Sequence, residues 1–329
     1  MFIAGDLGGT KTLLGLYEKT GTVWHCQREA CFKSAAYPSF ESILTEFMQG
    51  MTQKPAVLCL GVAGPVVDGH SSVTNLSWNL SEHGLAALTG IPGVKLLNDL
   101  QAMSLGLLGL PPERFVDLNP GACAKPGNLA VLAAGTGLGE AILYWDGERH
   151  HALATEGGHT DFAPNDPEQD DLLLYLRDRY RGHVSYERIL SGMGLITVYD
   201  FLRDTGRVPE SPAMRQRRLA SDDPAREISQ AALENSDALS LRALELFAKI
   251  YGAEAGNLAL QCFAVGGVMI GGGIAPKILP ALTSGAFMQA FCAKGRFADF
   301  LQTIPVRVAL ESGTVLLGAA AWAEQCLTA

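Results

Sequence analysis

The chain has 329 residues, of which 48% are hydrophobic and 18% are charged, and its formal net charge at pH 7 is -9. Because single domains contain roughly 100 to 200 residues, this length predicts two domains. The apolar composition excludes a disordered chain. The acidic balance argues against nucleic acid and anionic membranes as partners, because their phosphates require clustered Lys and Arg. We therefore expect a globular protein with a small-molecule partner.

The sequence shows no membrane span, secretory signal or cysteine pair typical of a metal site. The apolar stretch from Leu258 to Ile274 is interrupted by glycine and is too short to span a membrane. The first strand-like run begins directly after Met1, which leaves no room for a secretory signal. The seven cysteines form no CxxC pair, as expected of reduced thiols, and we expect no structural zinc. These features predict a cytoplasmic protein.

Strand-like and helical periodicities alternate along the chain. In chain order, they predict a strand-turn-strand at 2–17, a helix at 40–51, strands at 57–62 and 94–97, a strand-turn-strand at 129–144, a helix that starts at 166–169, a helix at 237–263, a strand at 268–270 and a helix at 314–326. This alternation predicts an α/β fold. The recurrence of strand-turn-strand predicts two related halves.

The same glycine-rich turn occurs in both strand-turn-strand units. Its copies are Gly5-Asp6-Leu7-Gly8-Gly9-Thr10 and Gly135-Thr136-Gly137. Glycine permits positive φ and lets backbone N–H groups approach an anion. No P-loop motif is present, and one copy by itself is more typical of an ordinary hairpin than of a phosphate site. Together, the two turns predict a nucleotide held between two halves, and Gly271-Gly272-Gly273 after the strand at 268–270 is a candidate third contact.

Asp6 lies near the end of the first predicted strand. A carboxylate there is unfavourable unless it is hydrated, hydrogen-bonded or close to a cation. We expect it to face Mg²⁺ through metal-bound water, because Mg²⁺ loses its water reluctantly. The alternative is that Asp6 stabilises its own turn.

Asn98 and Asp99 follow the strand at 94–97 and precede a helical stretch. Ligands of α/β sheets bind at such carboxyl ends of strands. Asp99 is a candidate general base for a hydroxyl group, and Asn98 is a candidate to orient the same substrate through its amide. The alternative is that Asp99 caps the helix.

A further group of polar residues surrounds a glycine pair. Glu156 and His159 flank Gly157-Gly158, and Glu187 supplies a second carboxylate. Carboxylates and imidazoles hydrogen-bond to adjacent hydroxyls, so we expect a sugar here, with Glu156 as a buried acceptor. The alternatives are a catalytic metal on Glu156, His159 and Asp161, or a structural histidine.

Taken in chain order, these motifs resemble the bacterial glucokinase family. The resemblance implies an α/β fold of the hexokinase type, with two actin-like (ribonuclease H-like) lobes around a cleft. The small lobe would span 1–109 and include the C-terminal helix at 312–329, and the large lobe would span 110–311.

The resemblance also implies roles for these residues. Asp99 would be the general base, and the sugar would bind to Asn98, Asp99, Glu156, His159 and Glu187. The two glycine turns would hold the phosphates of ATP, with Mg²⁺ near Asp6, and Gly271 and Gly272 would flank the adenosine. The implied reaction is phosphorylation of glucose to glucose 6-phosphate by a homodimer. A kinase for another hexose or N-acetylhexosamine, a different phosphoryl donor and a non-catalytic sugar-sensing regulator remain alternatives.

Overall fold

The computed structural model describes the chain except for residues 21–22, 74–75 and 329. Contacts within the chain separate two compact units. The first unit consists of Met1–Pro112, Ala152–Ala154 and Gly313–Ala329, and the second consists of Glu113–His151 and Thr155–Ser312. The lobe boundaries expected from the sequence lie at 109 and 312, and the expectation did not include the short segment at 152–154. Ala329, the last residue of the expected C-terminal helix, lies outside the described residues.

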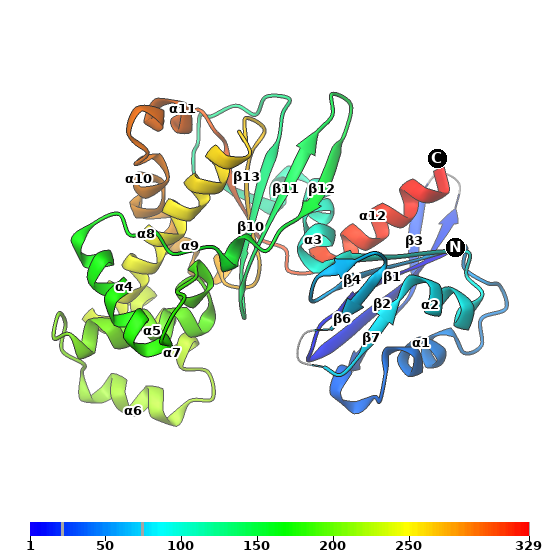
Figure 1. Ribbon diagram of the computed structural model, residues 1–329, viewed down its shortest axis with the longest axis horizontal. Coiled ribbons are helices and arrows are strands. Elements are labelled where there is room, and N and C mark those ends of the chain that lie inside the picture. Colours follow the sequence, from blue (N-terminus) through cyan, green and yellow to red (C-terminus); the bar gives the residue numbers. More distant parts are fainter. Residues whose placement is uncertain (21–22, 74–75, 329) are drawn as a thin grey trace. The chain divides into compact units, whose positions relative to one another are not determined.

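A five-stranded sheet forms the centre of the first unit (Figure 1). In spatial order, its strands are β3 (Val23–Lys33), β2 (Lys11–Thr20), β1 (Phe2–Leu7), β4 (Val57–Val62) and β8 (Gly93–Asn98). The first three are antiparallel, and β1, β4 and β8 are parallel. A small antiparallel sheet accompanies it, made of β5 (Val66–Val67), β6 (His70–Ser72) and β7 (Asn79–Ser81).

Every residue of β4 is buried, because apolar side chains cover both faces of the sheet. Helices α1 (Phe40–Met48) and α2 (Glu82–Thr89) contribute to one hydrophobic cluster. Helices α3 (Asp99–Leu108) and α12 (Thr314–Thr328) contribute to the other. The helix predicted at 40–51 is confirmed but is shorter, since Gly50 has a φ of 77° and follows the last helical turn.

Helices α3 and α12 pack closely through two glycines. A Cβ atom at Gly106 would overlap the carbonyl oxygen of Thr314, and one at Gly318 would overlap that of Ala102. The two backbones therefore approach closer than any side chain allows. This contact fixes the C-terminal helix on the first unit.

We predict that Gly318→Ala lowers the free energy of unfolding of the first unit by about 1–3 kcal/mol, the usual cost of overpacking, although alanine favours helix formation. The matched control is Gly109→Ala at the end of α3, where the nearest atom would lie 3.6 Å from the new Cβ. Urea denaturation followed by tryptophan fluorescence compares the variants. Equal midpoints would contradict the role given to this contact.

A six-stranded sheet forms the centre of the second unit (Figure 1). In spatial order, its strands are β12 (His150–Ala154), β11 (Leu138–Trp145), β10 (Leu129–Ala134), β13 (Gly267–Gly271), β14 (Val306–Ala309) and β9 (Phe115–Asp117). The helices are α4 (Pro167–Tyr180), α5 (Gly192–Asp204), α6 (Pro212–Ala220), α7 (Pro224–Leu233), α8 (Ala238–Gln261), α9 (Leu279–Thr283), α10 (Ala286–Cys292) and α11 (Ala298–Gln302). The largest hydrophobic cluster surrounds α8 and β10.

Two helix starts follow the predicted sequence signals. Asp166 accepts a hydrogen bond from the backbone N of Gln169 at 2.9 Å, and the Gln169 amide donates back to it at 3.1 Å. Asp237 likewise accepts from the backbone N of Ser240 at 2.8 Å. These caps satisfy N–H groups that a helix start leaves free. The helix starts predicted at 166–169 and 237 are confirmed.

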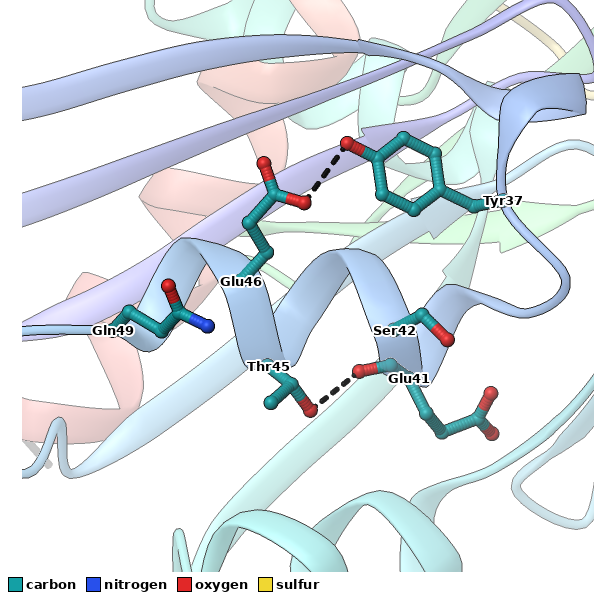
Figure 2. A pocket seen from close by; sticks show the side chains of 6 residues that line it. All are labelled: Tyr37, Glu41, Ser42, Thr45, Glu46 and Gln49. Carbon is teal, nitrogen blue, oxygen red and sulfur yellow. Dashed lines mark hydrogen bonds between the residues drawn. The ribbon is translucent and has the colours of Figure 1, made fainter.

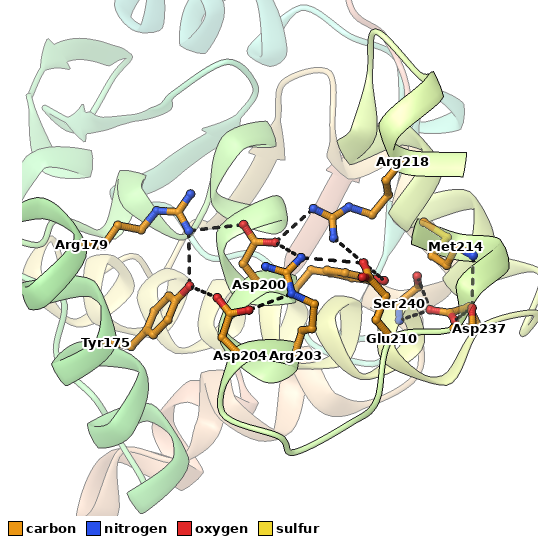
Figure 3. A network of polar contacts seen from close by, with 12 residues as sticks. Tyr175, Arg179, Asp200, Arg203, Asp204, Glu210, Met214, Arg218, Asp237 and Ser240 are labelled. Carbon is orange, nitrogen blue, oxygen red and sulfur yellow. Dashed lines mark hydrogen bonds and ion pairs between the residues drawn. The ribbon is translucent and has the colours of Figure 1, made fainter. Parts of the chain in front are cut away.

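A charged cluster joins α4, α5 and α6 in the second unit (Figure 3). Asp200 pairs with Arg179, Arg203 and Arg218 at 3.3, 3.0 and 3.1 Å. Arg218 also pairs with Glu210 at 3.0 Å and lies over the ring of Tyr199. The charges balance one another, so this cluster is a structural link between helices.

The two units share one strand topology. In each sheet an antiparallel hairpin has one further strand beside it and two parallel strands on its other side, and the second sheet ends with the additional antiparallel strand β9. The predicted α/β architecture and the predicted relation between the halves agree with this arrangement. Over the described part of the chain, no helix has the length and apolar character required to cross a bilayer.

Candidate active site

The first glycine turn joins β1 to β2. The Gly8 N–H donates to the carbonyl of Lys11 at 3.0 Å. The buried Ser34 hydroxyl donates to the carbonyl of Gly8 at 2.8 Å, and the Ser34 N–H donates to that of Thr10 at 3.1 Å. Ser34 therefore anchors the turn from a distant segment, which no local sequence signal indicated.

Both glycine turns are hairpin loops, but positive φ does not explain their glycines. Gly8, Gly135 and Gly137 all have φ outside the left-handed region, so that part of the sequence argument is wrong. Space is the reason at Gly137, where a Cβ would overlap the Glu187 carboxylate. At Gly135 a Cβ would have no neighbour within 4 Å, so this glycine leaves the turn open to an approaching group.

Asp6 is half-buried on β1, and burial raises the pKa of its carboxyl, with Lys11 acting in the opposite direction. Within the described residues its carboxylate has no hydrogen-bond partner, so it does not stabilise its own turn. A partly desolvated, unpaired carboxylate beside a glycine turn fits a hydrated Mg²⁺. In the described ranges no set of three or more His, Cys, Asp and Glu side chains suits direct metal binding, so no such cluster supports the alternative of a metal on Glu156, His159 and Asp161.

Asn98 and Asp99 lie at the junction of β8 and α3. Asn98, not Asp99, is the N-cap: its Oδ1 accepts from the N–H groups of Leu100 and Gln101 at 2.9 and 3.3 Å. The alternative of Asp99 as the cap is therefore wrong. The Asn98 amide also donates to the carbonyl of Gly64 at 3.1 Å. Asp99 is the first residue of α3, half-buried, and its Oδ1 accepts from the Leu100 N–H at 2.9 Å.

Strand register brings these groups to one edge of the first sheet. Leu7 on β1 pairs with Val62 on β4, which pairs with Asn98 on β8. Asp6 directly precedes Leu7 in the chain and Asp99 directly follows Asn98, so both acids lie at the carboxyl ends of parallel strands. The N-terminus of α3 also favours negative charge at Asp99.

The second glycine turn lies against the N-terminus of α5. The Gly192 N–H donates to the carbonyl of Gly135 at 2.9 Å. Ser191 caps the helix by accepting from the Gly194 N–H at 3.1 Å. An open glycine turn beside a helix N-terminus offers backbone N–H groups to an anion. The sequence reasoning missed α5 here, although a serine before two closely spaced glycines is a capping signal.

The predicted sugar residues lie close to this turn. Glu156 and His159 belong to the short turn at 156–159, and Glu187 belongs to the turn Tyr186–Arg188. The two turns are joined because the Tyr186 N–H donates to the carbonyl of Thr160 at 3.2 Å. Glu187 accepts from the Leu138 N–H at 3.1 Å. Glu156 and His159 are exposed, so the expected burial of Glu156 is wrong, as is the alternative of a satisfied core histidine.

The third glycine segment also lies beside the second turn. Gly272 has a φ of 82°, and a Cβ there would lie 2.6 Å from the carbonyl oxygen of Ala134. The Ile274 N–H donates to the same carbonyl at 3.2 Å. Residues 271–273 and 135–137 thus meet at the ends of neighbouring strands β13 and β10.

Comparison with known proteins places the chain in a family. A family model described as Glucokinase matches residues 3–326. The glucokinase of Synechocystis sp. is 40% identical over 347 residues, covering 98% of both chains. The chain belongs to the glucokinase family. The predicted family resemblance is confirmed, and so is the class of enzyme, a kinase.

Solved structures support the same assignment. A glucokinase from an Antarctic psychrotroph has a TM-score of 0.85, with 27% identity and 98% of each chain covered. A ROK family glucokinase from Streptomyces griseus, in complex with glucose and AMPPNP, has a TM-score of 0.64 at 20% identity, covering 98% of this chain and 99% of that one. The predicted hexokinase-type fold built from actin-like lobes is confirmed.

A surface hollow of about 630 Å³ lies along α1 of this glucokinase-family chain (Figure 2). Its lining residues are Tyr37, Glu41, Ser42, Thr45, Glu46 and Gln49. Two carboxylates and no cation line it, which does not suit a phosphate. None of the predicted site residues lines it, so it is not the candidate active site.

A buried pair of acids lies behind the sugar residues, and the sequence reasoning missed it. Glu140 on β11 and Glu254 on α8 are each only 2% exposed, and their carboxyl groups are near enough to interact electrostatically. Burial, followed by the charge of Glu254, raises the pKa of Glu140 to about 9. Burial also raises the pKa of Glu254. Ionising both buried carboxyl groups would place two negative charges side by side at a high cost in free energy, so Glu140 keeps its proton at neutral pH.

This pair predicts a pH dependence of stability. The unfolded chain releases the Glu140 proton near its ordinary pKa of 4.5, whereas the folded chain keeps it up to about pH 9. Glu140 therefore lowers the free energy of unfolding progressively as the pH rises through that window. Glu140→Gln removes this contribution, so we expect the stability advantage of the variant over the wild type to grow from pH 5 to pH 9. Thermal denaturation of both proteins at pH 5 and pH 9 measures this difference in stability. The same difference at both pH values would contradict the prediction.

Proposed function

We propose that this protein transfers the γ-phosphoryl group of ATP to the 6-hydroxyl of D-glucose. The observation that carries the proposal is the grouping of Glu156, His159 and Glu187 beside the open turn at 135–137 in the second unit. These side chains suit adjacent sugar hydroxyls, and the turn with the N-terminus of α5 suits phosphate. The glucose and AMPPNP bound by the Streptomyces griseus relative support the same pair of substrates.

The first unit supplies the complementary groups in this proposal. Asp99 acts as general base and accepts the proton of the attacking hydroxyl, while Asn98 holds the start of α3 that positions it. The turn at Gly8–Thr10 binds phosphate oxygens. Asp6 holds Mg²⁺ through water, and the ion neutralises charge on the phosphates when it is bound. The adenosine lies against Gly271 and Gly272 in the second unit.

We extend the proposal to the cell and the assembly. The acidic net charge supports an enzyme without nucleic-acid partners, and the seven free cysteines support a reducing, cytoplasmic compartment. The family resemblance supports a homodimer. Sedimentation as a single chain at micromolar concentration would contradict the dimer.

A coupled assay of ADP release tests the reaction directly. With Mg-ATP we expect turnover with glucose to exceed that with mannose, fructose and N-acetylhexosamines, because the relatives that the chain matches are named glucokinases. Replacing ATP with ADP or polyphosphate in the same assay identifies the donor. A faster rate with an N-acetylhexosamine would assign a different sugar, and no turnover with any sugar would contradict the proposal.

Asp99→Asn tests the general base. Asparagine can still accept the Leu100 N–H but cannot take a proton, so we expect kcat to fall by about 100- to 10,000-fold while glucose binding persists. Calorimetry measures glucose binding, and the ADP-release assay measures kcat. The matched control is Asp161→Asn, an exposed carboxylate paired with His183 in the second unit, for which kcat should not change. A kcat near the wild-type value in Asp99→Asn would remove Asp99 from this role.

A further inference from the structure

Glu140 lies directly beneath the turn that carries Glu156 and His159. A Cβ atom added at Gly157 would overlap the Glu140 Oε2 atom, so the carboxyl group touches the backbone of this turn. The backbone carbonyl of Glu140 accepts from the Thr155 hydroxyl at 2.8 Å, and this hydroxyl accepts from the Gly157 N–H at 3.1 Å. Glu140 thus supports the turn through both its side chain and its backbone.

The charge of the acid pair is carried by Glu254. Its carboxylate accepts from the Asn257 amide at 2.8 Å and interacts electrostatically with Glu140 and Tyr186. Lys294 donates to the Asn257 Oδ1 atom at 2.5 Å and provides the opposite charge. An ionised Glu254 with these partners requires a neutral Glu140.

The same network reaches the second sugar-site turn. The Asn257 amide donates to the Tyr186 hydroxyl at 3.0 Å, and Tyr186 directly precedes Glu187. One buried network therefore contacts Gly157 on one side and Tyr186 on the other. The Glu140 Oε1 atom has no hydrogen-bond partner within the described residues. Burying an unpaired oxygen lowers the free energy of unfolding, so a gain in stability does not explain why an acid stands at this position.

We infer that the buried acids Glu140 and Glu254 position the turns that carry Glu156, His159 and Glu187, and that the sugar site is formed only while Glu140 is protonated. Both acids are positioning residues, since neither belongs to the set proposed to touch the sugar. The inference rests on the proposed function of this site.

Loss of the Glu140 proton would disturb the site for an electrostatic reason. The titratable groups facing Glu140 are Glu254 and Tyr251 from α8, and Tyr186 and Lys294 lie one contact further along the network. Burial raises the pKa values of Tyr186 and Tyr251, so both stay neutral, and Lys294 is already engaged with Asn257. A second negative charge would therefore have no compensating partner, and the two carboxylates would separate.

The experiment measures the glucose Kd by calorimetry on the full chain between pH 7 and pH 10, without ATP. With a Glu140 pKa of about 9, the wild-type Kd should rise about tenfold by pH 10. Glu140→Gln has nearly the same shape, keeps a donor group and cannot ionise, so its Kd should stay within about twofold over the range and match the wild type at pH 7. Equal pH profiles for the two proteins would overturn the inference.

Glu254→Gln gives an independent arm. It removes the second carboxylate, so loss of the Glu140 proton no longer creates two adjacent negative charges, and the rise in Kd at high pH should be much smaller than in the wild type. A rise as large as that of the wild type would overturn the inference, whether or not Glu140→Gln folds. Asp200→Asn is the matched control for a buried carboxylate in the same unit, outside this network, and should keep the wild-type pH profile.

Two outcomes separate this inference from the proposed function. If the wild type does not bind glucose at pH 7, both are wrong. If the wild type binds glucose and Glu156→Gln weakens that binding, but the Glu140 and Glu254 variants keep the wild-type profile, only the positioning role is wrong.

Discussion

The site residues of each unit depend on a central strand that is buried on both faces. β4 in the first unit and β10 in the second have no exposed face, so a shift in register would move apolar side chains out of contact on both sides. That constraint holds the neighbouring hairpins in place. The turn after β1 and the turn after β10 occupy equivalent positions because the strand topology around them is the same.

Backbone proximity does more in this protein than glycine flexibility. Gly137 allows the Glu187 carboxylate to reach the N–H of Leu138, Gly157 allows the Glu140 carboxyl to lie under a turn, and Gly318 brings α12 onto α3. In each case a side chain would occupy the space taken by another group. The cost of ordering glycine is offset by contacts that no other residue permits.

Buried acids in the second unit are neutralised in two different ways, by arginine side chains or by keeping a proton. Around Asp200, three guanidinium groups balance the acids and join helices. Around Glu254, one lysine compensates one carboxylate, and the neighbouring acid must hold a proton. The second arrangement is sensitive to the loss of a proton. Only the second contacts the turns proposed to bind the substrate.

Local sequence determined those features whose causes lie within a few residues: the strand-turn-strand units, the capped helix starts at Asp166 and Asp237, and the order of polar motifs that indicated the family. The proximity of Glu187 to the second glycine turn, the capping role of Asn98 in place of Asp99, the anchoring of the first turn by Ser34 and the pairing of Glu140 with Glu254 were decided by the tertiary structure. These contacts join residues that are far apart in sequence or compete for the same N–H groups. Periodicity and spacing report which face a residue occupies, whereas the partner that a polar group meets depends on how whole elements pack.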